Sequence, residues 1–350
     1  MKRVIVNMIG ALLVCSMALT GCSRSKDAAA AASGLRGKSS KPQTEWRIAL
    51  VPKDSTNAWF VRMEEGVKRY ALDSGLNAFQ KGPAKTDAAE QVKVIEDLIA
   101  QSVDAICVVP VDPAALEPVL KKAMDKGIVV VSHEGSSLEN TYYDIEAFDN
   151  SAYGAFIMDS LARAMGENGV YTTMVAHVTN ASHNEWADGA IARQQEAYPN
   201  LTLLGEQARV ESEDNMERAY DVAKQLFKAH PNLKGIVGTS SKDAPGIARA
   251  IAELGLTEKA FVAGTGMPNE CRDALKNGSL AAITLWDPAD SGYALCALAA
   301  KILRGDPVSA PLDLGLEGYN AMQFAPGSST IFLGAGWIGI TKENVDNYNF

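Results

Sequence analysis

The sequence predicts an α/β protein of two lobes, each built around a doubly wound parallel sheet. From Trp46 onward, short apolar runs alternate with amphipathic segments of helical length, as in repeated βαβ units. The runs lack polar alternation, as expected for strands that helices cover on both faces. About 300 residues follow Trp46, which is enough for two lobes that each bury a core.

The elements of the first lobe follow one another in a regular order. Asp112 and Pro113 predict the N-cap and the first helical position of one helix, and Gly127 predicts its end. We expect strand 47–52, helix 58–71, helix 88–100, strand 105–109, helix 113–126 and strand 128–131.

A second round of alternation begins near Asn150. No G-x-G-x-x-G follows a strand and there is no Walker lysine motif, so the sequence shows no nucleotide-binding signature. We expect helix 150–165, strand 170–175, helix 185–196, strand 201–206, helix 214–228, strand 235–238, helix 244–254, strand 260–264, helix 269–276 and strand 281–285.

The N-terminal segment predicts export. Lys2 and Arg3 precede an apolar stretch at 8–19 without acidic residues, which is typical of a signal peptide and too short to span a bilayer. The Leu-Thr-Gly-Cys sequence that ends at Cys22 looks like a bacterial lipobox. We therefore expect a lipoprotein signal peptide at 1–21 and a lipid anchor at Cys22, which tethers the protein to a membrane surface outside the cytoplasm. The alternative is an ordinary signal peptide that happens to contain a cysteine.

The segment after the lipobox is expected to be a flexible tether at 22–45. It contains five consecutive alanines at 28–32, several Ser, Gly and Lys residues, and almost no large apolar side chain. Such a segment cannot bury enough surface to become ordered. We therefore expect the globular part of the chain to begin at Trp46.

Composition excludes several classes of protein. The formal net charge of −9 becomes −11 when the two basic residues of the signal are removed, and an acidic exported protein is a poor candidate for nucleic-acid binding. No later apolar run is long enough to span a bilayer. The globular part has three cysteines, and a disulfide between Cys271 and Cys296 is one alternative. We favour free, buried thiols for Cys107, Cys271 and Cys296.

The ends of the predicted strands locate a candidate site. In open parallel sheets, ligands bind beyond the carboxyl ends of the strands. Carboxylates, amides, hydroxyls and aromatic rings follow several strands of both lobes, so we expect them to meet in one cleft. The candidate ligand-binding residues are Lys53, Asn57, Trp59, Phe60, His133, Glu134, His183, Asn184, Ser241, Asp243, Trp286 and Asp287.

Some of these residues have a second, purely structural interpretation. Asp243 and Asn150 also suit helix N-caps, and Asp287 also suits a turn before Pro288. Trp286 also suits packing at a hinge, and either Trp59 or Phe60 is expected to face the core, because both begin one amphipathic helix.

Three histidines, His133, His177 and His183, fall on loops that should line the cleft. A zinc site with three ligands is one interpretation, but their spacing is not that of a helical metal motif. We favour hydrogen-bonding or rim residues, and we expect no metal and no cofactor.

The order of the elements and several short motifs resemble a known family. The motifs are Val51-Pro52-Lys53, Asp104-Ala105-Ile106, Ile128-Val129-Val130-Val131, Asn184-Glu185-Trp186, Leu285-Trp286-Asp287-Pro288 and the closing Thr341-Lys342-Glu343-Asn344-Val345-Asp346. Over residues 46–350 the chain resembles the type I periplasmic sugar-binding proteins of ABC importers, and within them the branch that binds rhamnose or autoinducer-2. The resemblance implies two lobes joined by three crossings of the chain, near Asp149, 286–288 and Gly336. The first lobe would take 46–149 and 288–336, and the second 150–287 and 337–350.

The resemblance also implies roles for particular residues. Lys53 and Glu134 match ligand-contacting positions of the family. Members that bind autoinducer-2 have Asp-Gln where this chain has Ser182-His183, Pro-x-Ala at 239–241, and Trp-Asp where it has His133-Glu134. Because half of the implied ligand shell is changed, we expect a monosaccharide that the sequence does not specify.

The cleft residues suit a small polyol. Charged groups can hold adjacent hydroxyls, and aromatic planes can cover the apolar face of a sugar ring. The resemblance implies a monomeric receptor that delivers a monosaccharide or similar polyol to an ABC permease by hinge closure. The alternative is a sensory receptor for a sugar or for a furanose such as autoinducer-2. A glycosidase would need a recognisable acid/base pair, so we expect no enzyme. A repressor is excluded by the export signal and by the lack of an N-terminal helix-turn-helix.

Overall fold

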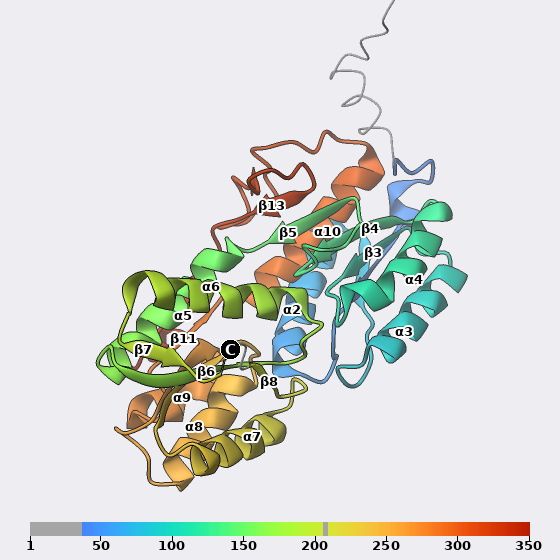
Figure 1. Ribbon diagram of the computed structural model, residues 1–350. Coiled ribbons are helices and arrows are strands. Elements are labelled where there is room, and N and C mark those ends of the chain that lie inside the picture. Colours follow the sequence, from blue (N-terminus) through green and yellow to red (C-terminus); the bar gives the residue numbers. More distant parts are fainter. Residues whose placement is uncertain (1–36, 206–208) are drawn as a thin grey trace, which may run out of the picture.

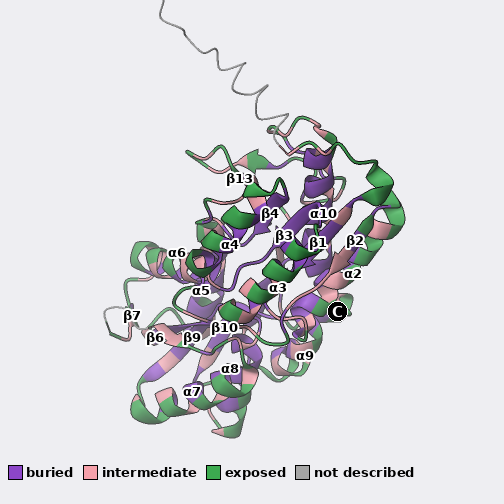
Figure 2. Cartoon of the chain, turned by 90° about the vertical axis from the view of Figure 1, so that its right-hand side faces the viewer, coloured by how far each residue is buried: buried purple, intermediate pink, exposed green. Residues whose placement is uncertain are grey.

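The computed structural model describes residues 37–205 and 209–350, which form two α/β lobes that lie side by side (Figure 1). The expected signal peptide at 1–21, the lipidation site Cys22 and the tether as far as residue 36 lie outside the described residues. Each lobe has a central sheet with helices on both faces. In Figure 2 the strands and the inner faces of the helices are buried, and the outer helix faces are exposed.

Within the described ranges, seven strands form the first sheet, in the order β12-β13-β5-β4-β3-β1-β2. Its centre is parallel, with Ala49 paired to Ile106 between β1 and β3, whereas β12 is antiparallel to β13. The strands are β1 (Arg47–Val51), β2 (Asn77–Gln80), β3 (Ala105–Val108), β4 (Val129–His133), β5 (Tyr143–Glu146), β12 (Gln323–Phe324) and β13 (Ile331–Leu333).

Helices cover both faces of the first sheet. The pair α2 (Ala58–Ser74) and α10 (Pro288–Arg304) packs on one face, and the pair α3 (Ala88–Ala100) and α4 (Pro113–Asp125) packs on the other. The helices begin at capping side chains, such as Asp112, whose carboxylate accepts the backbone N–H of Ala115.

The second lobe repeats this architecture. Its strand order is β14-β11-β10-β9-β6-β7, and β8 also pairs with β6. Helices α5 and α6 lie on one face, and α7, α8 and α9 lie on the other (Figure 1). The elements are α5 (Asn150–Met165), β6 (Gly169–Val175), α6 (Ala181–Ala197), β7 (Leu201–Leu203), β8 (Arg209–Glu211), α7 (Met216–Ala229), β9 (Leu233–Gly238), α8 (Asp243–Glu253), β10 (Phe261–Thr265), α9 (Pro268–Asn277), β11 (Ala282–Leu285) and β14 (Ile338–Ile340), with short 3₁₀ helices η1 (Gln43–Glu45) and η2 (Val345–Asn347) near the ends.

Glycines allow α5 and α6 to approach each other closely. A Cβ atom added at Gly154 of α5 would lie 2.0 Å from the carbonyl oxygen of Trp186 in α6. One added at Gly189 of α6 would lie 2.5 Å from the carbonyl oxygen of Ser151. Close backbone approach of this kind needs residues without a side chain at the contact.

The chain passes between the two sheets in three short segments. These are 147–149 between β5 and α5, 286–287 between β11 and α10, and 334–337 between β13 and β14. In the part of the chain described, no helix has the length and apolar character to cross a membrane.

The end of the expected tether lies against the first lobe. The backbone N–H of Ser39 donates to the carbonyl oxygen of Leu303, and Lys41 pairs with Asp104 at 2.7 Å. The Trp46 indole is 2% exposed and donates to the carbonyl oxygen of Lys41. The expected boundary at residue 45 therefore differs from the structure, because composition alone does not show that a polar segment can bind to the surface of its own domain.

Candidate ligand-binding site

A cavity lies between the lobes at the carboxyl ends of strands from both sheets. The empty space among its side chains is about 290 Å³ when its open mouth is included. It is lined by Lys53, Asn57, Trp59, Phe60, Glu134, His183, Trp186, Asp214, Thr239, Ser241, Thr265 and Trp286.

The structure brings eight of the twelve predicted site residues together around this cavity. Their chain positions span more than two hundred residues, so only the fold makes them neighbours. The eight are Lys53, Asn57, Trp59, Phe60, Glu134, His183, Ser241 and Trp286.

A buried ion pair forms the charged wall of the cavity. Lys53 Nζ lies 2.6 Å from Glu134 Oε2, and the two side chains are 3% and 4% exposed. Burial alone would raise the pKa of Glu134, but the charge and hydrogen bond of Lys53, with smaller contributions from the His133 and His183 rings, outweigh burial and lower the pKa to about 2. The carboxylate is therefore ionised at neutral pH and can accept hydrogen bonds from a ligand.

The backbone of Glu134 directs this carboxylate. Its φ is 56°, a left-handed conformation that costs a residue with a Cβ atom roughly 1–2 kcal/mol. The following N–H, of Gly135, donates to Asp144 Oδ1 and holds the turn. Such a conformation at a cavity wall is consistent with a functional constraint.

Hydrogen bonds between the lobes show a closed cleft. Ser182 Oγ donates to Glu134 Oε2 at 2.9 Å, and Thr86 Oγ1 donates to Asp214 Oδ2 at 3.1 Å. Each bond joins a residue of the first lobe to one of the second. Glu134 and Asp214 therefore both line the cavity and hold it shut.

Tryptophan rings form the apolar wall. The rings of Trp59 and Trp286 meet edge to face with centroids 4.7 Å apart, and Trp186 lies 5.6 Å from Trp286. Trp59 and Phe60 both pack in the hydrophobic core and both line the cavity, so the two roles that the sequence divided between them are shared by both. Aromatic surfaces of this kind suit the apolar face of a small ring.

His183 presents a hydrogen-bond donor to the cavity. The backbone N–H of Ala176 donates to its Nδ1 at 3.3 Å, so in the neutral ring the proton lies on Nε2. Burial and the charge of Lys53 lower the pKa of His183 to about 3, although Glu134 and Asp214 oppose the shift. The ring is therefore neutral at physiological pH.

We expect His183 to make the protein sensitive to acid. The unfolded chain binds a proton on His183 below its usual pKa of 6.5, whereas the folded protein does not until about pH 3. Stability should therefore fall between these values by up to about 1.4 kcal/mol per pH unit. Asp243, whose pKa burial raises to about 7, contributes in the opposite sense between pH 3.8 and 7. The His183→Asn variant isolates the effect: its stability relative to the wild type should rise as pH falls from 6.5 to 5 in urea titrations. A difference that does not change with pH would contradict a neutral His183, and His230→Asn is the control.

Four predicted residues lie outside the cavity and make backbone or hinge contacts instead. His133 Nδ1 donates to the carbonyl oxygen of Ile145, and its ring packs behind Trp286. The Asn184 amide nitrogen donates to backbone carbonyls, including that of Asn180, and its oxygen accepts from Arg209.

The other two residues, Asp243 and Asp287, act at helix starts. Asp243 accepts the backbone N–H groups of Thr239 and Ser240 where α8 begins. Asp287 caps α10 and forms a two-pronged ion pair with Arg62 at 2.9 and 2.6 Å. Asp243 is therefore not the N-cap of α8, a position that Lys242 holds, but it fixes the loop before this helix, and Asp287 caps α10.

Four residues that line the cavity were absent from the sequence-based set. Thr265 ends β10 one residue beyond the expected strand, so a better strand boundary would have included it. Thr239 follows β9 directly and obeys the same strand-end rule. Trp186 stands in a motif used only for the family resemblance. Asp214 was expected only to begin a helix, and nothing in its sequence context separates a residue at a helix start from a residue of the cavity wall.

Within residues 37–205 and 209–350, no group of three or more His, Cys, Asp or Glu side chains is arranged to hold a metal ion. Cys107, Cys271 and Cys296 are buried free thiols. Burial and the nearby Cys296 thiol raise the pKa of Cys107, so Cys107 and not Cys271 is the neighbour of Cys296.

Two α/β lobes that close over a polar, tryptophan-lined cavity define a bilobal ligand-binding protein. The periplasmic binding protein domain family matches residues 48–307, so the chain belongs to this family. The family is extracytoplasmic, which agrees with the expected export.

Curated relatives extend this result. The D-allose-binding periplasmic protein of Escherichia coli (strain K12) is 28% identical over 256 residues, which cover 70% of this chain and 80% of that protein. The ribose import binding protein of Bacillus subtilis (strain 168) is 24% identical over 282 residues, with coverages of 77% and 87%. Both relatives are named for binding a sugar, and the family to which this chain belongs is one of binding proteins, as predicted.

Solved structures confirm the predicted fold class. LsrB from Clostridium saccharobutylicum in complex with AI-2 has a TM-score of 0.80 at 23% identity, covering 87% of this chain and all of that one. A solute-binding protein from Clostridium phytofermentas with bound L-rhamnose also has a TM-score of 0.80, at 22% identity, covering 88% and 99%.

Proposed function

We propose that this protein captures a monosaccharide or a similarly small polyol between its lobes and delivers it to an ABC permease. The proposal rests on the cavity, which combines the Lys53–Glu134 ion pair with hydroxyl groups and three tryptophan rings. Ionised groups can each hold two adjacent hydroxyls, and the rings can cover the apolar face of the guest. The relatives named for allose and ribose support the same class of ligand.

Closure would be the signal that a permease reads. A ligand that touches both lobes favours the closed form by its differential affinity for that form. Glu134 and Asp214 suit this role, since each lines the cavity and also accepts a hydrogen bond from the opposite lobe. We further propose that the protein acts as a monomer, anchored by a lipid on Cys22 after removal of residues 1–21.

A sensory receptor for a furanose signal is the second candidate. It is favoured by the likeness to the AI-2 complex, whose TM-score equals that of the rhamnose complex. The substituted residues Ser182-His183 and His133-Glu134 argue against autoinducer-2 itself and keep a monosaccharide as the first choice.

A thermal-shift screen tests the proposal. We expect one of D-allose, D-ribose, L-rhamnose or autoinducer-2 to raise the melting temperature in a concentration-dependent way. A ligand that binds only the folded state stabilises it by about 2.7 kcal/mol at a hundred times its Kd. Sugar acids are the matched control, because Glu134 and Asp214 disfavour an added negative charge in the cavity. If neutral sugars, polyols and furanoses all leave the melting temperature unchanged, the proposal is wrong.

A further inference from the structure

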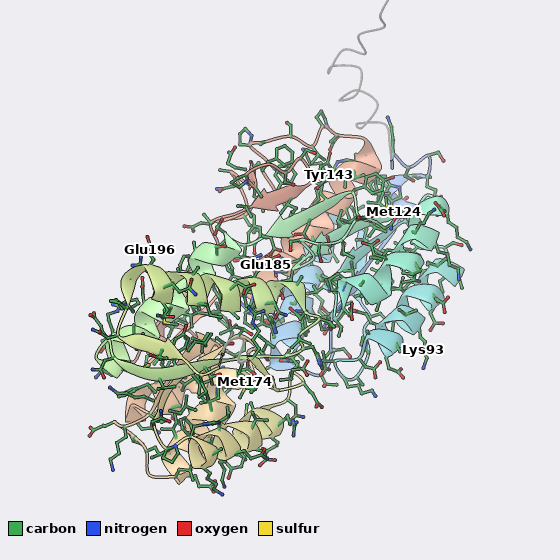
Figure 3. The ribbon with its side chains drawn as sticks, viewed as in Figure 1. Lys93, Met124, Tyr143, Met174, Glu185 and Glu196 are labelled. Atoms are coloured by element: carbon green, nitrogen blue, oxygen red, sulfur yellow. The ribbon has the colours of Figure 1, made fainter. Side chains whose placement is uncertain are left out.

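A chain of hydrogen bonds outside the cavity connects the first lobe to a tryptophan of the cavity wall. Ser136, in the loop after β4, donates to Glu185 Oε1 at 2.5 Å. The second oxygen of Glu185 accepts from Asn150 Nδ2 at 2.6 Å. Asn150 Oδ1 accepts the indole N–H of Trp186 at 2.7 Å. Figure 3 shows Glu185 on α6 where this helix meets the first lobe, whereas Glu196 lies at the far end of the helix.

The chemistry of the donors and acceptors fixes the direction of each of these hydrogen bonds. An indole N–H can only donate and an ionised carboxylate can only accept. Asn150 therefore turns its oxygen to Trp186 and its nitrogen to Glu185, and it satisfies both at once. An aspartate or a leucine at this position would break at least one of the two contacts.

The tryptophan at the end of the chain is part of the cavity. Trp186 is 1% exposed, and its ring lies 5.1 Å from that of His183 and 5.6 Å from that of Trp286. A rotation of this indole would change the shape of the wall. Its only polar atom is held by Asn150, at the first residue of α5, next to the crossing at 147–149.

The loop that carries Ser136 also carries Glu134. This loop of the first lobe therefore contacts α6 twice. Glu134 accepts from Ser182 inside the cleft, and Ser136 donates to Glu185 outside it. Only the inner contact competes with a ligand for hydrogen bonds. The outer contact can stay in place when the cavity is filled.

We propose that Asn150 is a positioning residue that couples closure of the lobes to the orientation of the Trp186 ring, with Ser136 and Glu185 as the link to the first lobe. All of these hydrogen bonds join side chains of this protein, so the coupling exists without a bound ligand. Its value for ligand selection rests on the proposed function, because Trp186 then shapes the wall that a sugar meets.

The test uses the protein labelled with 5-fluorotryptophan and no ligand. Fluorine NMR resolves the five tryptophans, and Trp186→Phe identifies the resonance of Trp186. We expect Asn150→Leu to move this resonance by several line widths. Ser136→Ala should move it in the same direction by more than one line width and should raise the radius of gyration in X-ray scattering. Ser137→Ala, a change at the exposed neighbour, is the matched control and should leave both unchanged.

Two results would overturn the proposal. One is a Trp186 resonance in Ser136→Ala that stays within a line width of the wild type. The other is a resonance in Asn150→Leu that does not move although the variant is folded by circular dichroism. A failed sugar screen would count against the proposed function alone, since these measurements need no sugar.

Discussion

Replacing Lys53 by methionine is expected to lower the free energy of unfolding by about 3–5 kcal/mol, because removing one partner of a buried ion pair leaves the other charge uncompensated. Glu134 is 4% exposed and lies 2.6 Å from the lysine, so the cost of its burial would no longer be offset. The same change should weaken sugar binding by at least ~1.5 kcal/mol, the scale of a hydrogen bond to a charged group. Urea unfolding and calorimetry measure the two effects.

Two further variants separate charge from packing. The double variant Lys53→Met with Glu134→Gln should recover part of the lost stability, since no ionised group remains unpaired, but not the binding. Lys68→Met, at an exposed ion pair with Glu64, should change stability by less than about 1 kcal/mol. If Lys53→Met is as mild as Lys68→Met, the ion pair has no important role in the fold or the site.

Gly154→Ala is expected to lower the free energy of unfolding by about 3 kcal/mol or more through overpacking. In an ordinary helix interior the same change stabilises by about 1 kcal/mol, so the sign itself is diagnostic. The added Cβ atom would lie 2.0 Å from the carbonyl oxygen of Trp186, and α5 and α6 would have to separate. Because α6 carries His183 and Trp186, sugar affinity should fall as well.

The matched control is Gly75→Ala, at the C-terminus of α2. Gly75 has a φ of 70° and open space around its Cα, so alanine there introduces backbone strain of about 1–2 kcal/mol without a collision. It lies at the C-terminal end of α2, whereas the cavity residues Trp59 and Phe60 lie at the opposite end of this helix, so alanine there should leave affinity unchanged. Equal losses in the two variants would show that the contact between α5 and α6 is not tight.

The long amphipathic helices and the central strands could be predicted from the sequence, and the edge strands could not. Helices α3 and α5 have the bounds that the apolar pattern predicts, although Asp149 and not Asn150 caps α5. Strand β5 was missed because it carries Asp144 and Glu146, both buried, where an apolar run is expected. Strand β2 and the short strands β8, β12, β13 and β14 have too few residues for a periodic pattern.

The strand-end rule located the cavity but not the use of each side chain within it. It placed Lys53 and Glu134 correctly at the same edge, because parallel strands end together. It also selected Asp243 and Asp287, whose carboxylates accept backbone N–H groups of a loop and of a helix start. Asp214 lines the cavity and Asp243 does not, and only three-dimensional contacts decide this difference.

The attachment of residues 37–45 has a mechanical consequence. Ser39, Lys41 and Trp46 bind to the first lobe alone, so a force transmitted through the N-terminal chain reaches that lobe and not the other. An attachment at the N-terminus would therefore hold the first lobe in place, while the second lobe remains free to rotate about the three connecting segments.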